Sequence, residues 1–459
     1  MNPTQGDLHA QVGVSRFDIT PPPGTRWKLW GAAVDDHAAG VHRRLTGTVL
    51  TISNGEHRRA IVSLDVCEWA DPNDEYSVRR RILDACGLEP DQLLLHSTHT
   101  HSGQAPALAS VGLAGGERIA EHLELIAARA ATATSEAFRD ASPGILTWGE
   151  GRSTLAAHRD QDWDGRPVVG HDPRVAAPET VTIGRVVSPE GRLRALLVSY
   201  ACHPTVLGWG NRLISPDYVG ALRGLVESRH EGALVLFLQG ASGHLAPADQ
   251  YRDDPSAADR AGRALGYAVL AGLELMPEPD HRLAPDVVVE SGAPLGVWTQ
   301  QAVAPSERLE IHRLDLALPR RTESVELDGE LPEHVRAERL ARAEQVARIA
   351  GGEGQLAYPV WIWELGELVL VAHPGEAYSW LASALRRALA PRPVLVANLT
   401  NGAGAFYLPP RAAYAHPGYT VAQTPAGPGS LELLAGAVLA ELGVPGERTS
   451  VHNNSGASR

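Results

Sequence analysis

LLLHSTHTHS, residues 93–102, places three histidines directly behind a short apolar run. The same arrangement returns in three later stretches, in which an apolar run ends in a possible metal ligand: ALLVSYACHPT (195–205), LVLVAHPGE (368–376) and VLVANLTNGAGAFY (394–407). Short apolar runs bounded by turn residues are typical of buried strands. In α/β proteins, ligands bind beyond the carboxyl ends of such strands. The four stretches therefore predict one shared site at the edge of a sheet.

The rest of the chain alternates between strand-like and helix-like segments. Further strands are predicted at 12–19, 48–52, 60–64, 144–148, 180–187 and 193–199. Helices are predicted at 73–86, 117–139, 218–229, 257–275, 333–350, 377–389 and 430–442, and residues 283–325 are expected to be extended or irregular. Alternation of this kind indicates the α/β class. We expect one large domain over 12–445, with central mixed sheets and outer helices, and a disordered tail at 446–459.

The composition excludes several classes of function. The chain has 459 residues, 44% of them hydrophobic, and a net charge of -13. An acidic protein is poorly suited to nucleic acid or to anionic lipid surfaces, which attract basic residues. Three cysteines without regular spacing do not indicate a disulfide framework. With no secretory pattern at the N-terminus and no apolar stretch of membrane-spanning length, we expect a cytoplasmic protein without stable membrane insertion. The oligomeric state stays open.

The histidine and glutamate side chains that follow the four apolar runs favour zinc, because zinc binds imidazole nitrogen and carboxylate oxygen. His99 and His101 are two residues apart, so they face the same side if strand geometry persists beyond the apolar run. A lone histidine at a strand end is more often structural, but this His-Thr-His spacing has few structural uses. The candidates are His96, His99, His101, His203, His373, Glu376 and Tyr407.

Several motifs together resemble a known family. They are THTHS (98–102), ACHPT (201–205), HPGE (373–376) and NGAGAFYLPPRAAY (401–414), with VGVSRFDITPPPG (12–24), SLD (63–65), LISPDY (213–218) and FLQGASGHLAP (237–247) falling in the family's order. In these motifs the chain is similar to the catalytic domain of the neutral/alkaline non-lysosomal ceramidases, from about residue 12 to 442. The resemblance implies a zinc enzyme that hydrolyses an amide.

The resemblance also implies roles for individual residues. Zinc would be held by His99, His203, Glu376 and Tyr407. His101 would lie beside the metal and contact the substrate oxygen, although His99 and His101 could exchange roles. Arg159 would orient the substrate, and Tyr419 looks like a second active-site tyrosine.

The chain departs from the family at a segment that carries a proposed serine nucleophile, Gly-Asp-x-Ser-Pro. Here the matching stretch is GHLAP (243–247), with Ala246 in place of the serine and His244 in place of the aspartate. An alanine side chain has no nucleophile, so we expect zinc-bound water to attack the scissile carbonyl. His244 is either a proton shuttle, since imidazole titrates near neutral pH, or a hydrogen-bonding support for the site.

We expect no counterpart of the family's C-terminal β-sandwich domain in this protein. This departure and the acidic chain, with 5% aromatic residues, favour a small or medium acylated amide over ceramide as substrate.

Other functions compete with this interpretation. The protein could be a zinc-binding pseudoenzyme or ligand-binding protein, or an esterase that uses the same site. The stretch GASGH (240–244) resembles the nucleophile elbow of α/β-hydrolases, but His244 stands where that motif needs glycine. Six tryptophans line either a pocket or the core, and the sequence does not separate these roles: Trp27, Trp30, Trp209, Trp298, Trp361 and Trp363.

Overall fold

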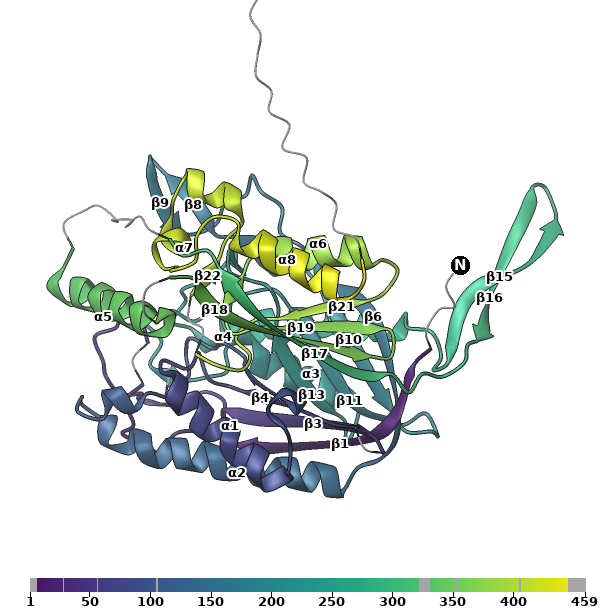
Figure 1. Ribbon diagram of the computed structural model, residues 1–459, viewed down its shortest axis with the longest axis horizontal. Helices are drawn as coiled ribbons and strands as arrows, with labels where there is room; N and C mark the ends of the chain where they lie inside the picture. The colour runs from purple at the N-terminus through teal and green to yellow at the C-terminus, as the bar shows by residue number, and fades with distance from the viewer. Residues whose placement is uncertain are drawn as a thin grey trace, which may run out of the picture.

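Two β-sheets packed face to face form the centre of the molecule, and helices cover their outer faces (Figure 1). This computed structural model describes residues 6–27, 29–55, 57–104, 106–321, 331–351, 354–403 and 406–444. The predicted tail at 446–459 lies outside these residues. Over the described ranges, the larger sheet has the strand order β13-β11-β10-β6-β1-β3-β4-β5, and the smaller has the order β17-β18-β19-β21.

The larger sheet is mixed. Its strands are β1 (Leu8–Asp18), β3 (Thr46–Asn54), β4 (His57–Leu64), β5 (Leu93–Ser97), β6 (Ser142–Arg152), β10 (Thr180–Val187), β11 (Leu193–Tyr200) and β13 (Leu234–Gln239). Neighbouring strands are antiparallel except at the two edges, where β4 is parallel to β5 and β11 is parallel to β13.

The smaller sheet packs on the larger one through a shared apolar core. Its strands are β17 (Leu309–Leu318), β18 (Leu356–Leu365), β19 (Leu368–Ala372) and β21 (Val394–Ala397), of which β19 and β21 are parallel. Leu50 and Leu94 of the larger sheet belong to the same buried cluster as Trp363 and Leu370 of the smaller one. Each such side chain contributes about 1.5–3 kcal/mol when it is fully buried, so this interface holds the sheets together.

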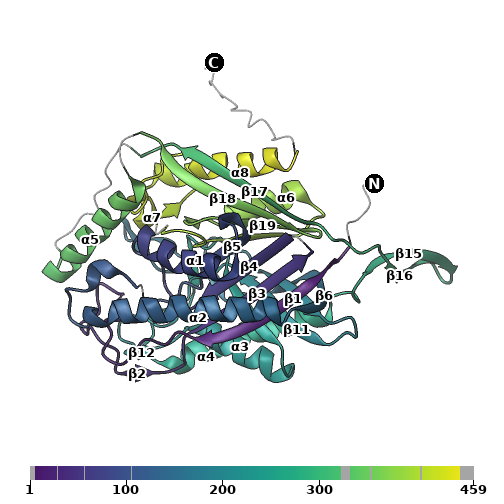
Figure 2. The same cartoon turned by 60° about the horizontal axis from the view of Figure 1, so that its bottom comes forward.

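Helices complete a four-layer arrangement, with α1, α2, α3 and α4 against the larger sheet and α6 and α8 against the smaller one (Figures 1 and 2). Their bounds are α1 (Pro72–Cys86), α2 (Ile119–Arg139), α3 (Tyr218–Arg229), α4 (Pro255–Glu274), α5 (Glu333–Ala350), α6 (Trp380–Leu389), α7 (Tyr419–Ala422) and α8 (Ser430–Glu441). Local chemistry sets their ends. Asp71 accepts the Asn73 N–H where α1 begins, and Gly87 ends it in the left-handed conformation.

Four short two-stranded pairs lie outside the two main sheets in the described part of the chain. They are β2 (Gly40–Val41) with β12 (Leu213–Ile214), β7 (Ala156–His158) with β14 (Leu245–Pro247), β8 (Asp160–Trp163) with β9 (Arg166–Val169), and β20 (Glu376–Ala377) with β22 (Tyr407–Leu408). A longer hairpin, β15 (His281–Glu290) with β16 (Pro294–Ala302), projects from the body in both views. Its apolar side chains are exposed, including Val288 and Trp298.

The predicted fold class is confirmed: the chain is α/β, with central mixed sheets and outer helices. The helices at 218–229 and 333–350 have the predicted bounds. No helix among the described residues combines the length and apolar character needed to cross a bilayer.

Three parts of the prediction differ from the structure. The helix expected from residue 377 begins at Trp380, because Ala377 pairs with Leu408 in the β20–β22 ladder. The stretch expected to be extended or irregular contains three regular strands, β15 to β17, as far as it is described. Strand β18 was not predicted at all; Pro359, which lacks a backbone N–H, interrupts its pattern.

Candidate metal centre

The four apolar runs with polar ends are all strands, and each belongs to a parallel pair. They are β5, β11, β19 and β21. Because the carboxyl ends of parallel strands share an edge, the residues that follow them are brought together. The ligand atoms of His99, His203 and Glu376, which are far apart in sequence, lie within 4.8 Å of one another, and all three side chains are buried.

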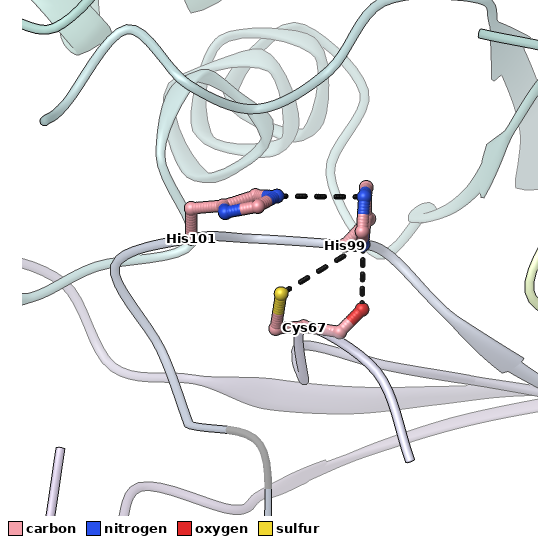
Figure 3. A group of neighbouring side chains, drawn as sticks. All are labelled: Cys67, His99 and His101. Atoms are coloured by element: carbon pink, nitrogen blue, oxygen red, sulfur yellow. Dashed lines mark hydrogen bonds between the residues drawn. The ribbon is translucent and has the colours of Figure 1, made fainter. Parts of the chain in front are cut away.

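His99 lies in a turn rather than in a strand. Strand β5 ends at Ser97, and His99 has a positive φ of 71°. The condition set for His99 and His101, that strand geometry persists beyond the apolar run, is therefore not met. The two histidines still meet, because the turn brings their Nε2 atoms to 3.4 Å, with His101 pointing at His99 (Figure 3).

Backbone carbonyl groups fix the orientation of both imidazole ligands. The Nδ1 of His99 lies 2.8 Å from the carbonyl oxygen of Cys67. The Nδ1 of His203 lies 3.0 Å from the carbonyl oxygens of Ser242 and Leu245. A carbonyl only accepts hydrogen bonds, so Nδ1 carries the proton in each ring. In the neutral ring, Nε2 then presents a lone pair to the site, as a metal-ligating histidine does.

Glu376 completes a set of three converging acceptors. Its Oε2 lies 2.9 Å from His203 Nε2 and 3.4 Å from His99 Nε2. Its Oε1 is buried without a hydrogen-bond partner among the described residues. Lone pairs that converge in a buried site need a cation between them. Two imidazole nitrogens and a carboxylate are ligands that suit zinc, so the residues present fit this metal.

Electrostatics without a metal support the same conclusion. Burial raises the pKa of the Glu376 carboxyl, but His99 and His203 outweigh burial and hold this pKa well below its usual range. Burial lowers the pKa of His99, while the Glu376 carboxylate reverses this effect and raises it well above normal. The Glu376 carboxylate thus favours a positive charge at this position. For His203, burial and the Arg159 charge lower the pKa to about 3.

Tyr407 lies beside Glu376 because the two residues are partners in the β20–β22 ladder. Its hydroxyl accepts a 3.1 Å hydrogen bond from Nη2 of Arg159, which also donates to the carbonyl oxygen of Gly243 at 2.9 Å. Burial and the Glu376 carboxylate raise the pKa of the phenol. The ring of Tyr419 packs edge-on against Tyr407 at 5.8 Å. Both Arg159 and Tyr419 thus adjoin the expected ligand set.

His244 lies in a neighbouring cavity of about 800 Å³ that Tyr419 also lines. Its ring stacks on Tyr378 at 4.1 Å, and its Nε2 lies 3.2 Å from the hydroxyl of Ser379. Burial lowers its pKa well below the usual value, and the adjacent His158 adds to this effect. These contacts connect His244 with the cavity wall rather than with the three converging ligands.

Cys67 offers an alternative ligand, since it groups with His99 and His101 (Figure 3). Its Sγ is 3.8 Å from His99 Nδ1, but this nitrogen lies closer to the Cys67 carbonyl. The Nε2 of His99 therefore faces His203 and Glu376 instead. A further group, Glu310, His312 and Glu364, is an ion-pair network, because Arg308 and Arg392 bind Glu364 at 2.7 and 2.6 Å.

The sequence did not identify several residues near the site. The orienting carbonyl of Cys67 gives no sequence signal, because every residue has a carbonyl group. Arg342 of α5 pairs with Glu68 at 3.5 Å, and the charges of Tyr419 and Glu68 raise its pKa. A helix rich in charged residues gave no reason to single out Arg342.

Comparisons with known proteins identify the fold. No family model matches the chain, and no curated protein sequence matches it. Among solved structures, a crystal structure of neutral ceramidase from Pseudomonas aeruginosa aligns with a TM-score of 0.69 and 20% identity, covering 96% of this chain and 76% of that chain. A ceramidase complexed with C2 aligns with a TM-score of 0.66 and 17% identity, covering 97% and 77%.

The chain has the neutral ceramidase fold. The resemblance inferred from the motifs is therefore confirmed at the level of the fold. The alignments cover 96% and 97% of this chain, so the likeness in fold is not confined to one part of it.

Proposed function

We propose that this chain is a zinc-dependent hydrolase that cleaves the N-acyl bond of a small or medium amide. The proposed zinc ligands are His99, His203, Glu376 and Tyr407. The observation that carries the proposal is the convergence of three buried acceptors, with both Nδ1 atoms engaged by backbone carbonyl groups. The core residue His122 also bonds a backbone carbonyl, but only at the site do two imidazole Nε2 atoms converge with a carboxylate among the described residues. The ceramidase fold supports an amide as the scissile group.

When bound, zinc supplies a Lewis acid that polarises the scissile carbonyl and lowers the pKa of water to about 7. The chain's own residues supply the positioning. His101, next to His99, is placed to donate a hydrogen bond to the oxygen that gains negative charge, a role worth about 3–4 kcal/mol in other enzymes. Arg159 holds the Tyr407 hydroxyl and orients the substrate. For His244 we propose the supporting role, because its ring stacks on Tyr378 and its Nε2 lies 3.2 Å from the hydroxyl of Ser379.

The proposal is tested with the purified, zinc-loaded chain and a panel of N-acylated amines, peptides and esters. Hydrolysis of N-acyl amides that disappears in His203→Ala would support the proposal. Ester hydrolysis alone would favour an esterase on the same site. Zinc binding without turnover of any substrate would indicate a pseudoenzyme or ligand-binding protein.

A further inference from the structure

Three aromatic rings form a continuous face beside His101. The ring of Trp30 lies 5.1 Å from the ring of His101. Tyr251 packs edge-on against Trp30 at 5.6 Å, and Trp209 lies 5.6 Å from Tyr251 and 6.2 Å from Trp30. These three residues, called the aromatic face below, therefore contact one another and reach the expected active site through His101.

The aromatic face is not part of the hydrophobic core. Trp27, Trp361 and Trp363 are core residues that are at most 3% exposed, whereas Trp209 is 46% exposed. The indole Nε1 of Trp30 is buried and has no hydrogen-bond acceptor within the described part of the chain. A buried indole N–H normally finds a partner. The buried indole Nε1 atoms of the core residues Trp69 and Trp148 also lack an acceptor within the described residues, so the exposed ring beside a catalytic candidate, rather than the donor, points to a ligand.

The backbone around the aromatic face is constrained. Tyr251 has a positive φ of 61°, which is unfavourable for a residue with a side chain. It is held there by a 3.1 Å hydrogen bond from its N–H to the carbonyl of Thr205, two residues after His203. Gly208 accommodates this approach, because a Cβ at that position would lie 2.7 Å from the Tyr251 Cα. One loop thus carries the ligand His203, the support for Tyr251 and Trp209 itself. Strain of this kind concentrates at functional sites.

We propose that the aromatic face is a specificity subsite, which binds a planar aromatic group of the substrate. The inference rests on the proposed amide hydrolysis and names its substrate class, the arylacyl or arylalkyl amides. Aromatic rings favour edge-to-face and offset-stacked partners, and the exposed ring of Trp209 provides such a surface. A straight alkyl chain of equal carbon number buries apolar area but does not make the ring contacts.

Two matched pairs of substrates test the proposal with the zinc-loaded protein. An N-phenylacetyl amide is compared with the N-octanoyl amide of the same amine, and an N-acetyl benzylamine is compared with N-acetyl heptylamine. We expect one aromatic member to be preferred about tenfold in kcat/KM. Trp209→Ala should abolish this preference, mainly by raising KM for the aromatic substrates. The control is Trp298→Ala, which removes an exposed tryptophan of the β15–β16 hairpin and should preserve the preference.

A binding measurement separates this inference from the proposed function. Phenylacetate and octanoate are titrated into the zinc-loaded protein, and the indole N–H resonance of Trp30, assigned by its loss in Trp30→Phe, is followed by NMR. A shift caused by phenylacetate alone supports the aromatic face even if no amide is hydrolysed, in which case the proposed function alone fails. Hydrolysis with equal rates within both pairs, or equal responses to the two acids, would overturn the aromatic face and leave amide hydrolysis standing.

Discussion

Glu376 and Tyr407 are direct partners in a parallel two-stranded ladder, so their side chains project on the same side of it. Backbone hydrogen bonds hold this register: Glu376 N–H donates to Phe406 at 3.0 Å and Tyr378 N–H donates to Leu408 at 3.2 Å. The spacing of the carboxylate and the phenol is therefore set by regular secondary structure, although the two residues are separated by the whole of α6 and β21 in the sequence. Precise placement of this kind is what a metal site requires.

Removal of His203 should abolish stable zinc binding. His203→Ala deletes a ligand and leaves Glu376 Oε2 without its 2.9 Å partner. Loss of an outer residue that only orients a ligand costs about 10- to 100-fold in metal affinity, so loss of the ligand should cost more than about 100-fold. Elemental analysis after dialysis measures this effect. His312→Ala, in the ion-pair network, should keep its zinc, and full zinc occupancy in His203→Ala would disprove the assignment.

Arg159 and Tyr407 should act as a unit. Arg159→Gln removes the donor to the Tyr407 hydroxyl and should lower kcat/KM by about 10- to 1000-fold, the range found when one active-site donor is lost. Tyr407→Phe removes the acceptor, and the double variant should lose less than the sum of the two single changes. A double-mutant cycle on kcat/KM measures the coupling. Additive losses of kcat/KM would contradict the coupling. The matched control is Arg174→Gln, which changes an exposed arginine.

No covalent acyl-enzyme should accumulate during turnover. Ala246 is buried in β14 and has no oxygen with which to attack. Mass spectrometry of the protein quenched during turnover should show its unmodified mass, and product formation should show no initial burst. Ala246→Ser should not raise kcat/KM if water is the nucleophile. A trapped adduct in the unmutated protein would refute hydrolysis by direct attack of water.

The stability of the fold should depend on the ionisation of Asp217. Burial raises the pKa of its carboxyl to about 7, against the opposing hydrogen bonds from the Leu207 and Tyr218 N–H groups. The unfolded carboxyl has a pKa of about 3.9, so between these values unfolding releases a proton and stability falls as the pH rises. The slope is about 1.4 kcal/mol per pH unit for this one group.

Asp217→Asn cannot titrate at this position, which makes it the reference for the measurement. The free energy of unfolding of the wild type should fall by roughly 2–3 kcal/mol relative to the variant between about pH 5 and pH 8. Urea denaturation at a series of pH values gives this difference. A difference that stays constant with pH would show that the folded carboxyl keeps an ordinary pKa.

The sequence predicted the location of the site better than its geometry. His99, His203 and Glu376 follow apolar strands within a few residues, and strand ends are readable from local pattern. The pairing of those strands, which brings the ligands together, is a tertiary property. The convergence of His99 and His101 was predicted for the wrong reason, because the positive φ of His99 has no signature in a His-Thr-His motif.

The tryptophans show the same limit of prediction from local sequence. Trp30 and Trp361 are alike in sequence terms, yet Trp30 contacts His101 while Trp361 lies between the two sheets. Only contacts with residues distant in the sequence distinguish a tryptophan of the hydrophobic core from one beside the candidate site. Similarly, the carbonyl groups that orient His99 and His203 belong to Cys67, Ser242 and Leu245, and backbone acceptors leave no trace in residue identity.

The β15–β16 hairpin divides the candidate ligands into two sets. His99 and His203 precede its exposed turn in the sequence, and Glu376 and Tyr407 follow it. A cut at this turn would give two fragments, each with half of the site, that retain a mutual interface in the apolar core between the sheets. The chain is therefore suited to fragment complementation, in which zinc uptake reports the reassembly of two separately expressed halves.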